Sequence, residues 1–175
     1  GKTLRNQPWE ISLDRSFSEV VAACAAPRNP SPENKGAAEA LGGTWINPAM
    51  QAAYARLHQL GWAHSVEVRQ HGKLVGGLYG VAIGRVFFGE SMFSAESGGS
   101  KVALAALAHV LHEWGWPLID GQVENPHLVS LGAKVMPRAD FLRRIRQLTR
   151  QLGDQPGCIG PWTELAGQFP ASALA

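Results

Sequence analysis

The chain is poor in the residues and segments that define several protein classes. Cys24 and Cys158 are its two cysteines and lie far apart, so neither a secreted disulfide framework nor a CxxC metal site is predicted. No apolar run reaches the roughly 18 residues of a membrane span, and no signal peptide is recognisable. These absences predict a cytoplasmic protein with no membrane partner.

A large excess of one charge is also missing. Sixteen basic and fourteen acidic residues leave a formal net charge of +2, so the total charge does not indicate nucleic-acid binding, and only local clustering can. Hydrophobic residues make up 45% of the 175 residues and charged residues 17%, which is ordinary for a globular protein. The length suits one domain, and we expect a single domain over residues 1–175.

The pattern of apolar residues predicts the elements of this domain. Strands are predicted at residues 8–14, 64–70, 73–84, 85–91, 117–123 and 133–136. Helices are predicted at 16–26, 48–60, 97–115, 126–131 and 141–152. Ser16 with Glu19 has the spacing of a capping box, and Asn47, Ser100 and Asn125 are placed as helix caps. Residues 27–44 are predicted to form a flexible loop, and 153–175 an irregular tail.

The order of these elements resembles that of the acyl-CoA N-acyltransferase (GNAT) fold. This resemblance implies an α+β domain with a mostly antiparallel central sheet, which is splayed at the active site and flanked by helices. In such folds an activated acyl donor lies in the gap between two parted strands, where an amine attacks it. The order of elements alone does not determine the chemistry.

Several motifs resemble one family much more closely. They are TWI (44–46), HSVEV (64–68), GGLYGVAIGRVFFGESMFS (76–94), SKVALAAL (100–107), LIDGQVENPHLVSLGA (118–133) and MPRADFL (136–142). They resemble the leucyl/phenylalanyl-tRNA–protein transferases, and the likeness runs from about Pro8 to Leu142. That family transfers Leu, Phe or Met from aminoacyl-tRNA to proteins that begin with Arg or Lys, which marks them as N-degrons for degradation.

The implied reaction sets modest demands on the protein. The donor ester is already activated and the acceptor is an α-amine with an ordinary pKa of about 7.7–8.0, so no ATP, metal or redox cofactor is expected. The enzyme must bind an apolar side chain, orient the ester and assist the amine. We expect a monomer with two substrates, an aminoacyl-tRNA and an acceptor protein.

The resemblance assigns Glu90 to the cavity that holds the amino acid and the 3′ adenosine. An acid at this position can bind the aminoacyl ammonium group. The apolar walls of the same cavity are expected from Trp45, Leu78, Phe87, Leu107 and Leu111. The family often has Phe at the last two positions, so Leu there is expected to alter donor preference. From the residues alone, Glu90 reads as a strand-end acid, Trp45 as a hydrophobic staple and the others as core.

Asp120 and Gln122 match the family's catalytic pair. They lie two residues apart on a predicted strand, so both side chains are expected on one face. A neutral amide is a poor base, so Gln122 is read as an orienting group and Asp120 as the charge that holds the cationic acceptor. Without the resemblance, both read as hydrogen-bonded structural groups.

A tRNA partner requires positive charge near its phosphates. Five arginines gather within thirteen residues: Arg138, Arg143, Arg144, Arg146 and Arg150. On a helix, three of them share one face suited to phosphates, and Lys101 beside the long helix is a further candidate. The alternative is a solvated helix face.

Two other classes remain open. In a CoA-dependent N-acetyltransferase, a glycine-rich pyrophosphate loop precedes the long helix, but ESGGSKVA (96–103) has different spacing. In a non-catalytic tRNA-binding module, the arginine helix matters and Asp120 does not. Family members also carry a small extra domain before the matching segment, with an aromatic residue that helps to close the pocket, and we expect both to be missing here.

Overall fold

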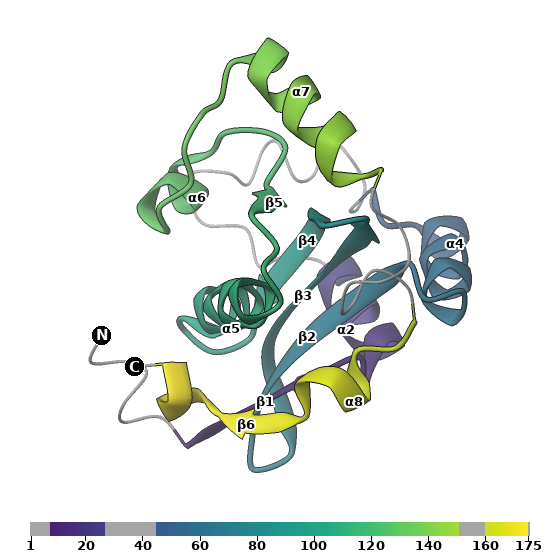
Figure 1. Ribbon diagram of the computed structural model, residues 1–175. Helices are drawn as coiled ribbons and strands as arrows, with labels where there is room; N and C mark the ends of the chain where they lie inside the picture. Colours follow the sequence, from purple (N-terminus) through teal and green to yellow (C-terminus); the bar gives the residue numbers. More distant parts are fainter. Residues whose placement is uncertain (1–7, 27–44, 151–159, 175) are drawn as a thin grey trace, which may run out of the picture.

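The fold is built on one six-stranded sheet. A computed structural model of the chain describes residues 8–26, 45–150 and 160–174 (Figure 1). In space the strands follow the order β5-β4-β3-β2-β1-β6. Their bounds are β1 Trp9–Leu13, β2 Ala63–Gln70, β3 Lys73–Ile83, β4 Val86–Ser94, β5 Leu118–Asp120 and β6 Gln168–Pro170. Neighbouring strands are antiparallel except β4 and β5, which run parallel.

Helices cover both faces of this sheet. Their bounds are α2 Phe17–Ala25, α4 Pro48–Gln59, α5 Gly99–Glu113, α6 Pro126–Ser130, α7 Arg138–Leu148 and α8 Thr163–Ala166, followed by the 3₁₀ helix η1 Ala171–Leu174. Figure 1 shows α5 on one face and α2 with α4 on the other, while α6 and α7 lie on the β5 side. None of the helices in the described part of the chain combines the length and apolarity that crossing a bilayer requires.

Each face has its own hydrophobic core. The larger core joins β1, β2, β3 and β4 to α5 and includes Trp116 and Trp162, which are both buried. The smaller core joins α2 and α4 to the opposite face and includes Phe17, Tyr54 and Tyr79. Apolar side chains alternate between the two cores along β3, where Leu78 belongs to the first and Tyr79 to the second.

Two glycines of β3 allow close approaches that a side chain would block. A Cβ atom on Gly76 would lie 2.4 Å from the Cα atom of Gly99, where α5 begins. A Cβ atom on Gly80 would lie 2.2 Å from the carbonyl oxygen of Phe88 and 2.6 Å from the Phe87 ring. The stretch GGLYG therefore brings the start of α5 and the Phe87 ring tightly against the sheet.

A buried carboxylate connects the β1–α2 junction to β2. Glu67 is fully buried and accepts hydrogen bonds from the hydroxyls of Ser12, at 2.5 Å, and Ser65, at 2.6 Å. The backbone N–H groups of Arg15 and Ser16 also donate to it, each at 3.4 Å. Burial raises the pKa of Glu67, and these hydrogen bonds oppose that rise.

The predicted capping box does not form. Ser16 stands at the N-cap of α2 without a side-chain cap bond, and its hydroxyl accepts a hydrogen bond from Arg69. Glu19 forms an ion pair with the same arginine. The start of α2 is therefore held by Glu67 and Arg69 of β2, which local sequence spacing does not reveal.

The other predicted strands and helix caps were confirmed in part. The strands near 8–14, 64–70, 73–84 and 85–91 and the caps at Asn47 and Asn125 are confirmed. The cap at Ser100 is wrong, because Gly98 takes that place with φ at 90° and Ser100 lies inside α5. Residues 133–136 form no strand, and the arginine helix already begins at Arg138.

The predicted irregular tail is also wrong for residues 160–174, which form α8, β6 and η1. β6 pairs with β1, so this segment completes the edge of the sheet opposite β5. The predicted loop at 27–44 lies outside the described residues.

Candidate functional site

The parallel pairing of β4 and β5 covers three residue pairs and ends where β5 ends. Val86 pairs with Leu118, Phe87 with Ile119 and Phe88 with Asp120. β5 ends at Asp120, whereas β4 continues to Ser94. The edge of β4 beyond Phe88 is therefore left without this partner, because β5 ends there.

Glu90 lies on β4 just beyond the end of this pairing. It is two residues beyond Phe88, which is roughly 7 Å along a strand. In the pairing with β3, Tyr79 opposes Ser91 and Gly80 opposes Gly89, so Glu90 is the extra residue of a β-bulge. Bulges change the direction of a side chain relative to simple alternation. The half-buried Glu90 carboxylate lies beside Tyr54, which belongs to the smaller core.

Asp120 and Gln122 do not share one strand face. Asp120 is the last residue of β5, and Gln122 lies beyond the strand with a positive φ of 64°. The backbone N–H of Gln122 donates to Oδ1 of Asp120 at 2.8 Å. The predicted strand was too long, because this side chain–backbone hydrogen bond turns the chain directly after Asp120.

A hollow of about 870 Å³ lies beside these two residues. Its walls are β5, the segment 121–124, α6, the segment 133–136 and the start of α7. Asp120 and Glu124 contribute acids to the lining, and Lys134 and Arg138 contribute bases. Val123 is 78% exposed and adds apolar surface. The hollow can therefore hold an extended polar chain with a cationic group next to Asp120.

Four of the predicted pocket walls lie together inside the larger core. They are almost fully buried: Leu78, Phe87, Leu107 and Leu111. Trp162 packs among them, with its ring 5.8 Å from that of Phe87 and its side chain fully buried. Sequence reasoning missed Trp162, because it follows the predicted last helix inside the stretch expected to be irregular, and nothing local indicates its long-range contact.

These four residues and Glu90 lie beside different cores. The four belong to the cluster under α5, whereas Glu90 lies beside Tyr54 in the cluster under α2 and α4. Trp45, the fifth predicted wall, is 52% exposed and packs edge-on against Tyr54, with ring centroids 6.3 Å apart. The structure thus brings Glu90 and Trp45 to the same residue, Tyr54.

The arginines of α7, together with Arg150 just beyond it, form an exposed basic surface. All five predicted arginines face solvent: Arg138, Arg143, Arg144, Arg146 and Arg150. Arg143 forms an ion pair with Asp140 one turn earlier. Lys101, the remaining predicted cation, is exposed in the first turn of α5.

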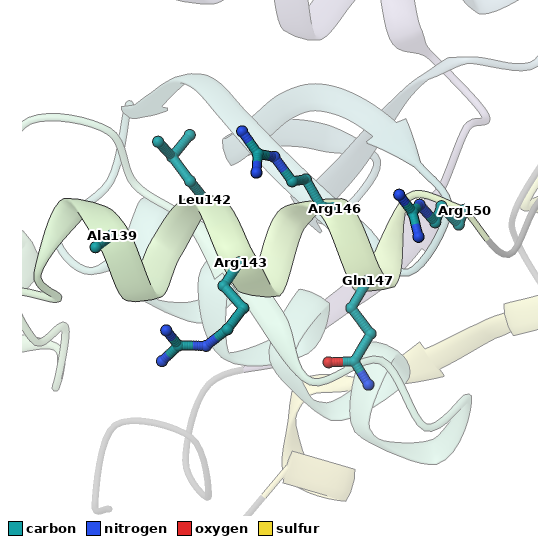
Figure 2. A pocket seen from close by; sticks show the side chains of 6 residues that line it. All are labelled: Ala139, Leu142, Arg143, Arg146, Gln147 and Arg150. Atoms are coloured by element: carbon teal, nitrogen blue, oxygen red, sulfur yellow. The ribbon is translucent and has the colours of Figure 1, made fainter.

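A shallow hollow of about 680 Å³ runs along α7. Figure 2 shows Arg143 and Gln147 directed to one side of the helix and Leu142 and Arg146 to the other, with Arg150 at its end. The three arginines predicted to share a face, Arg143, Arg146 and Arg150, all line this hollow. Such a basic surface suits a string of phosphates.

The mixed six-stranded sheet and its flanking helices define a GNAT-like α+β fold. Among solved structures, an aminoglycoside acetyltransferase from an uncultured soil metagenomic sample, in complex with sisomicin, matches with a TM-score of 0.50. The match covers 74% of this chain and 92% of that protein at 12% sequence identity, which shows a shared fold only.

The chain belongs to the leucyl/phenylalanyl-tRNA protein transferase family, whose sequence pattern matches residues 1–146. A leucyl/phenylalanyl-tRNA–protein transferase of Xanthomonas euvesicatoria pv. vesicatoria is 54% identical over 173 residues, which is 99% of this chain and 64% of that protein. One of Thiobacillus denitrificans is 52% identical over 162 residues, 93% of this chain and 65% of that protein. The chain thus spans about two thirds of the length of these relatives.

Proposed function

We propose that this chain carries the catalytic part of an aminoacyltransferase. It moves Leu, Phe or Met from aminoacyl-tRNA to the N-terminal α-amine of proteins that begin with Arg or Lys, creating an N-degron. The observation that supports this best is the end of β5 at Asp120 beside β4, which continues without this partner and carries Glu90. Two acids near the end of β5 suit a reaction that joins two amine-bearing substrates.

The proposed reaction needs only acid–base assistance and orientation. The acceptor ammonium loses a proton, and its nitrogen then bonds to the ester carbonyl carbon. The bond from that carbon to the ribose 3′ oxygen breaks, and a second proton passes from the attacking nitrogen to that oxygen. Amide and free tRNA are the products, so no redox change or additional co-substrate is required.

Each candidate residue has a distinct role in this proposal. Glu90 binds the ammonium of the aminoacyl group, and Trp45 lies against the donor beside it. Asp120 attracts the cationic acceptor in the neighbouring hollow, whose exposed valine and mixed charges suit a polypeptide N-terminus. Gln122 orients the amine, because its neutral side chain cannot serve as an effective base.

The arginines of α7 hold the tRNA in the same proposal. Their exposure and their shared hollow support contacts with several phosphates. Lys101, at the start of α5, adds a phosphate contact. A tRNA and an acceptor protein are both encountered in the cytoplasm, where we place the protein as a monomer.

The test is transfer of labelled leucine from charged tRNA to a protein with N-terminal Arg. The parent chain should transfer leucine, and Asp120→Asn should lose at least about 100-fold in rate under single-turnover conditions. Asn retains the oxygen that accepts the Gln122 N–H, so the local turn persists while the charge is lost. Binding of tRNA should be unchanged.

The matched control is Glu124→Gln, which removes an exposed carboxylate from the same hollow. It should keep most of the transfer activity. Equal losses in both variants would contradict a specific role for Asp120. A parent chain that binds tRNA without transfer would instead be a tRNA-binding module, and calorimetric binding of acetyl-CoA would indicate an N-acetyltransferase.

A further inference from the structure

The last segment of the described chain inserts a tryptophan into the larger core. Trp162 immediately precedes α8, and its side chain is fully buried. After α8 the chain forms β6, which pairs with β1, so this segment is part of the sheet (Figure 1). Before Trp162, the N–H of Gly160 donates to the carbonyl oxygen of Gly61 at 3.2 Å. The chain is therefore anchored on both sides of Trp162.

A buried carboxylate fixes the backbone at Trp162 itself. Asp14 directly follows β1, and its side chain is 1% exposed. Its Oδ2 accepts the backbone N–H of Trp162 at 2.9 Å and the Nδ1–H of His64 at 2.7 Å. Its Oδ1 accepts the backbone N–H of Ser65, also at 2.9 Å. One carboxylate therefore ties β1, β2 and the chain at Trp162 to one another.

The imidazole of His64 fixes the plane of the indole. The two rings are stacked, with centroids 3.9 Å apart and 4° between their planes. His64 is fully buried, and its Nε2 has no hydrogen-bond partner among the described residues, so the bond from Nδ1 to Asp14 orients the ring. Burial of incompletely paired polar groups is unfavourable. Apolar packing alone would avoid this penalty, which indicates that the position of the indole matters.

The indole of Trp162 borders the ring of Phe87 on the same face of the sheet. Their centroids are 5.8 Å apart, with 42° between the planes. On β3, Gly80 lies opposite His64, and a Cβ atom on Gly80 would be 2.6 Å from the Phe87 ring. The Phe87 ring therefore covers Gly80, next to the imidazole on which Trp162 stacks.

Phe87 also lies close to the end of β5. It pairs with Ile119, and the next pair, Phe88 with Asp120, is the last between the two strands. Phe87 is one of the expected walls of the donor pocket, and it belongs to the same cluster as Leu107. A shift of its ring would change the apolar surface within one residue pair of Asp120.

We propose that Trp162 is a positioning residue that sets the place of the Phe87 ring and thereby the size of the pocket for the donor side chain. The inference rests on the proposed function, because that function supplies the donor. The β3 backbone at Gly80 limits the Phe87 ring on one side. The indole, held by Asp14 and His64, limits it on the other.

The chain offers a matched pair of variants, Trp162→Phe and Trp116→Phe. Trp116 is a buried tryptophan of the same core, and its ring packs against those of Trp114 and Trp162. Both substitutions remove the same atoms from the same cluster, so Trp116→Phe measures general loosening of the core. Urea denaturation shows whether each variant folds cooperatively.

The primary measurement is calorimetric binding of 3′-leucylamido-adenosine and 3′-phenylalanylamido-adenosine, in which an amide replaces the reactive ester. In Trp162→Phe the ratio of the two affinities should move about 10-fold toward the phenylalanyl analogue, because Phe87 can tilt back and leave room for the larger side chain. In Trp116→Phe the ratio should remain that of the parent. An unchanged ratio in Trp162→Phe, or an equal shift in Trp116→Phe, would overturn the inference.

A double-mutant cycle tests whether Trp162 acts through Phe87. Trp162→Phe should shift the affinity ratio in the parent but not in a Phe87→Leu background, because the ring that the indole positions is then missing. A shift of the same size in both backgrounds would overturn the positioning role, since the indole would then contact the donor itself.

A further variant keeps the indole and changes its anchor. Asp14→Asn tolerates the positive φ of 58° at this position, but in either orientation of the amide an N–H group of Asn faces an N–H group that the carboxylate accepts. It should shift the ratio in the same direction as Trp162→Phe, by a smaller factor. If Trp162→Phe does not fold, an unchanged ratio in Asp14→Asn overturns the inference.

Failure of this inference can be distinguished from failure of the proposed function. Leucine transfer by the parent, with an unchanged affinity ratio in Trp162→Phe, would leave the function standing and remove the role of Trp162. A shifted ratio without transfer by the parent would support the positioning role and contradict the proposed reaction. A parent chain that binds neither analogue would overturn both.

Discussion

The sheet core and the outer lobe differ sharply in how their residues are held. We use outer lobe for residues 121–147, which include α6 and most of α7. In α5, Ala106, Leu107 and Leu111 are buried against the sheet. In the outer lobe α6 buries no residue, and the single buried residue of α7, Leu148, lies just past the lobe.

This difference determines what a substitution can reveal. A candidate in the core, such as Leu107, has a packing role that explains its presence without a ligand. A candidate in the outer lobe or at its border, such as Gln122 or Arg146, has little packing to explain it. Loss of activity is therefore informative in the lobe and ambiguous in the core unless stability is measured as well.

The largest expected effect is in the core. Leu107→Ala should lower the free energy of unfolding by about 2–5 kcal/mol, because it leaves a cavity among closely packed side chains. Val123→Ala, in the outer lobe, should change it by less than about 0.5 kcal/mol. Urea denaturation of both variants checks this, and similar losses would mean that the lobe is packed as firmly as the core.

Two asparagine helix caps provide a matched comparison, in which removal of a cap costs about 1 kcal/mol of folding free energy. Asn47 accepts the N–H of Met50 at 3.0 Å, and Asn125 accepts that of Leu128 at 2.9 Å. Asn47→Ala should lower global stability by about 1 kcal/mol, because α4 packs on the sheet. Asn125→Ala should lower it by less than half as much.

Hydrogen exchange distinguishes local opening at the Asn125 cap from global unfolding. In Asn125→Ala the amides of α6 should exchange faster while those of the sheet remain protected, since the lobe opens locally. Faster exchange throughout the sheet would show that α6 and the core unfold together.

A smaller effect on stability, which depends on pH, is expected from the buried carboxylate of Glu67. Its pKa is raised in the folded protein by burial, so the folded state binds this proton more tightly than the unfolded state. The stability that it contributes is complete below the unfolded value of 4.5 and is lost as pH rises through the folded pKa. The parent should therefore gain stability relative to Glu67→Gln as pH falls.

Denaturation midpoints of both proteins at about pH 7.5 and about pH 5 measure this difference. The hydrogen bonds to Glu67 from two serines and two backbone groups oppose the effect of burial, so the change should be modest. A parallel pH dependence in the two proteins would mean that these hydrogen bonds fully offset burial.

The smallest effect on stability is expected from the arginines. Arg143→Ala combined with Arg146→Ala should change the free energy of unfolding by less than about 0.5 kcal/mol, since both side chains are exposed. Binding to charged and uncharged tRNA should weaken alike. The slope of log affinity against log salt should fall by roughly one unit for each lost phosphate contact.

The control for this variant is Arg56→Ala, an exposed arginine on α4. It should leave the salt dependence of tRNA binding as in the parent. An unchanged slope in the double arginine variant as well would mean that the surface of α7 is solvated and makes no phosphate contacts.

Local sequence patterns predicted much of the fold correctly. Alternation located β1 to β4, and Asn-Pro pairs located the starts of α4 and α6. Predictions failed where a distant group competes with a local one. Ser16 has the spacing of a capping box, yet Arg69 binds both its hydroxyl and Glu19.

For the candidate site too, sequence patterns predicted one aspect and missed another. Motifs in the sequence were enough to single out Glu90, Asp120 and Gln122. Their arrangement was not predictable, because alternation along a strand assumes that the strand continues. β5 ends at Asp120, so Gln122 lies beyond the strand, and a bulge falls at Glu90. The side chains of Gln122 and Glu90 therefore do not follow the expected alternation.

Patterns along the chain were enough to predict the order of elements from β1 to α6, the family and the residue types available for chemistry, since they are carried by short stretches of sequence. The assembled sheet was needed to show where β5 ends beside β4, that a bulge falls at Glu90 and how Trp162 completes the larger core. Each of these depends on contacts between segments far apart in the chain. Trp162 is 75 residues beyond Phe87, and such packing follows from the shape of the assembled sheet and not from local periodicity.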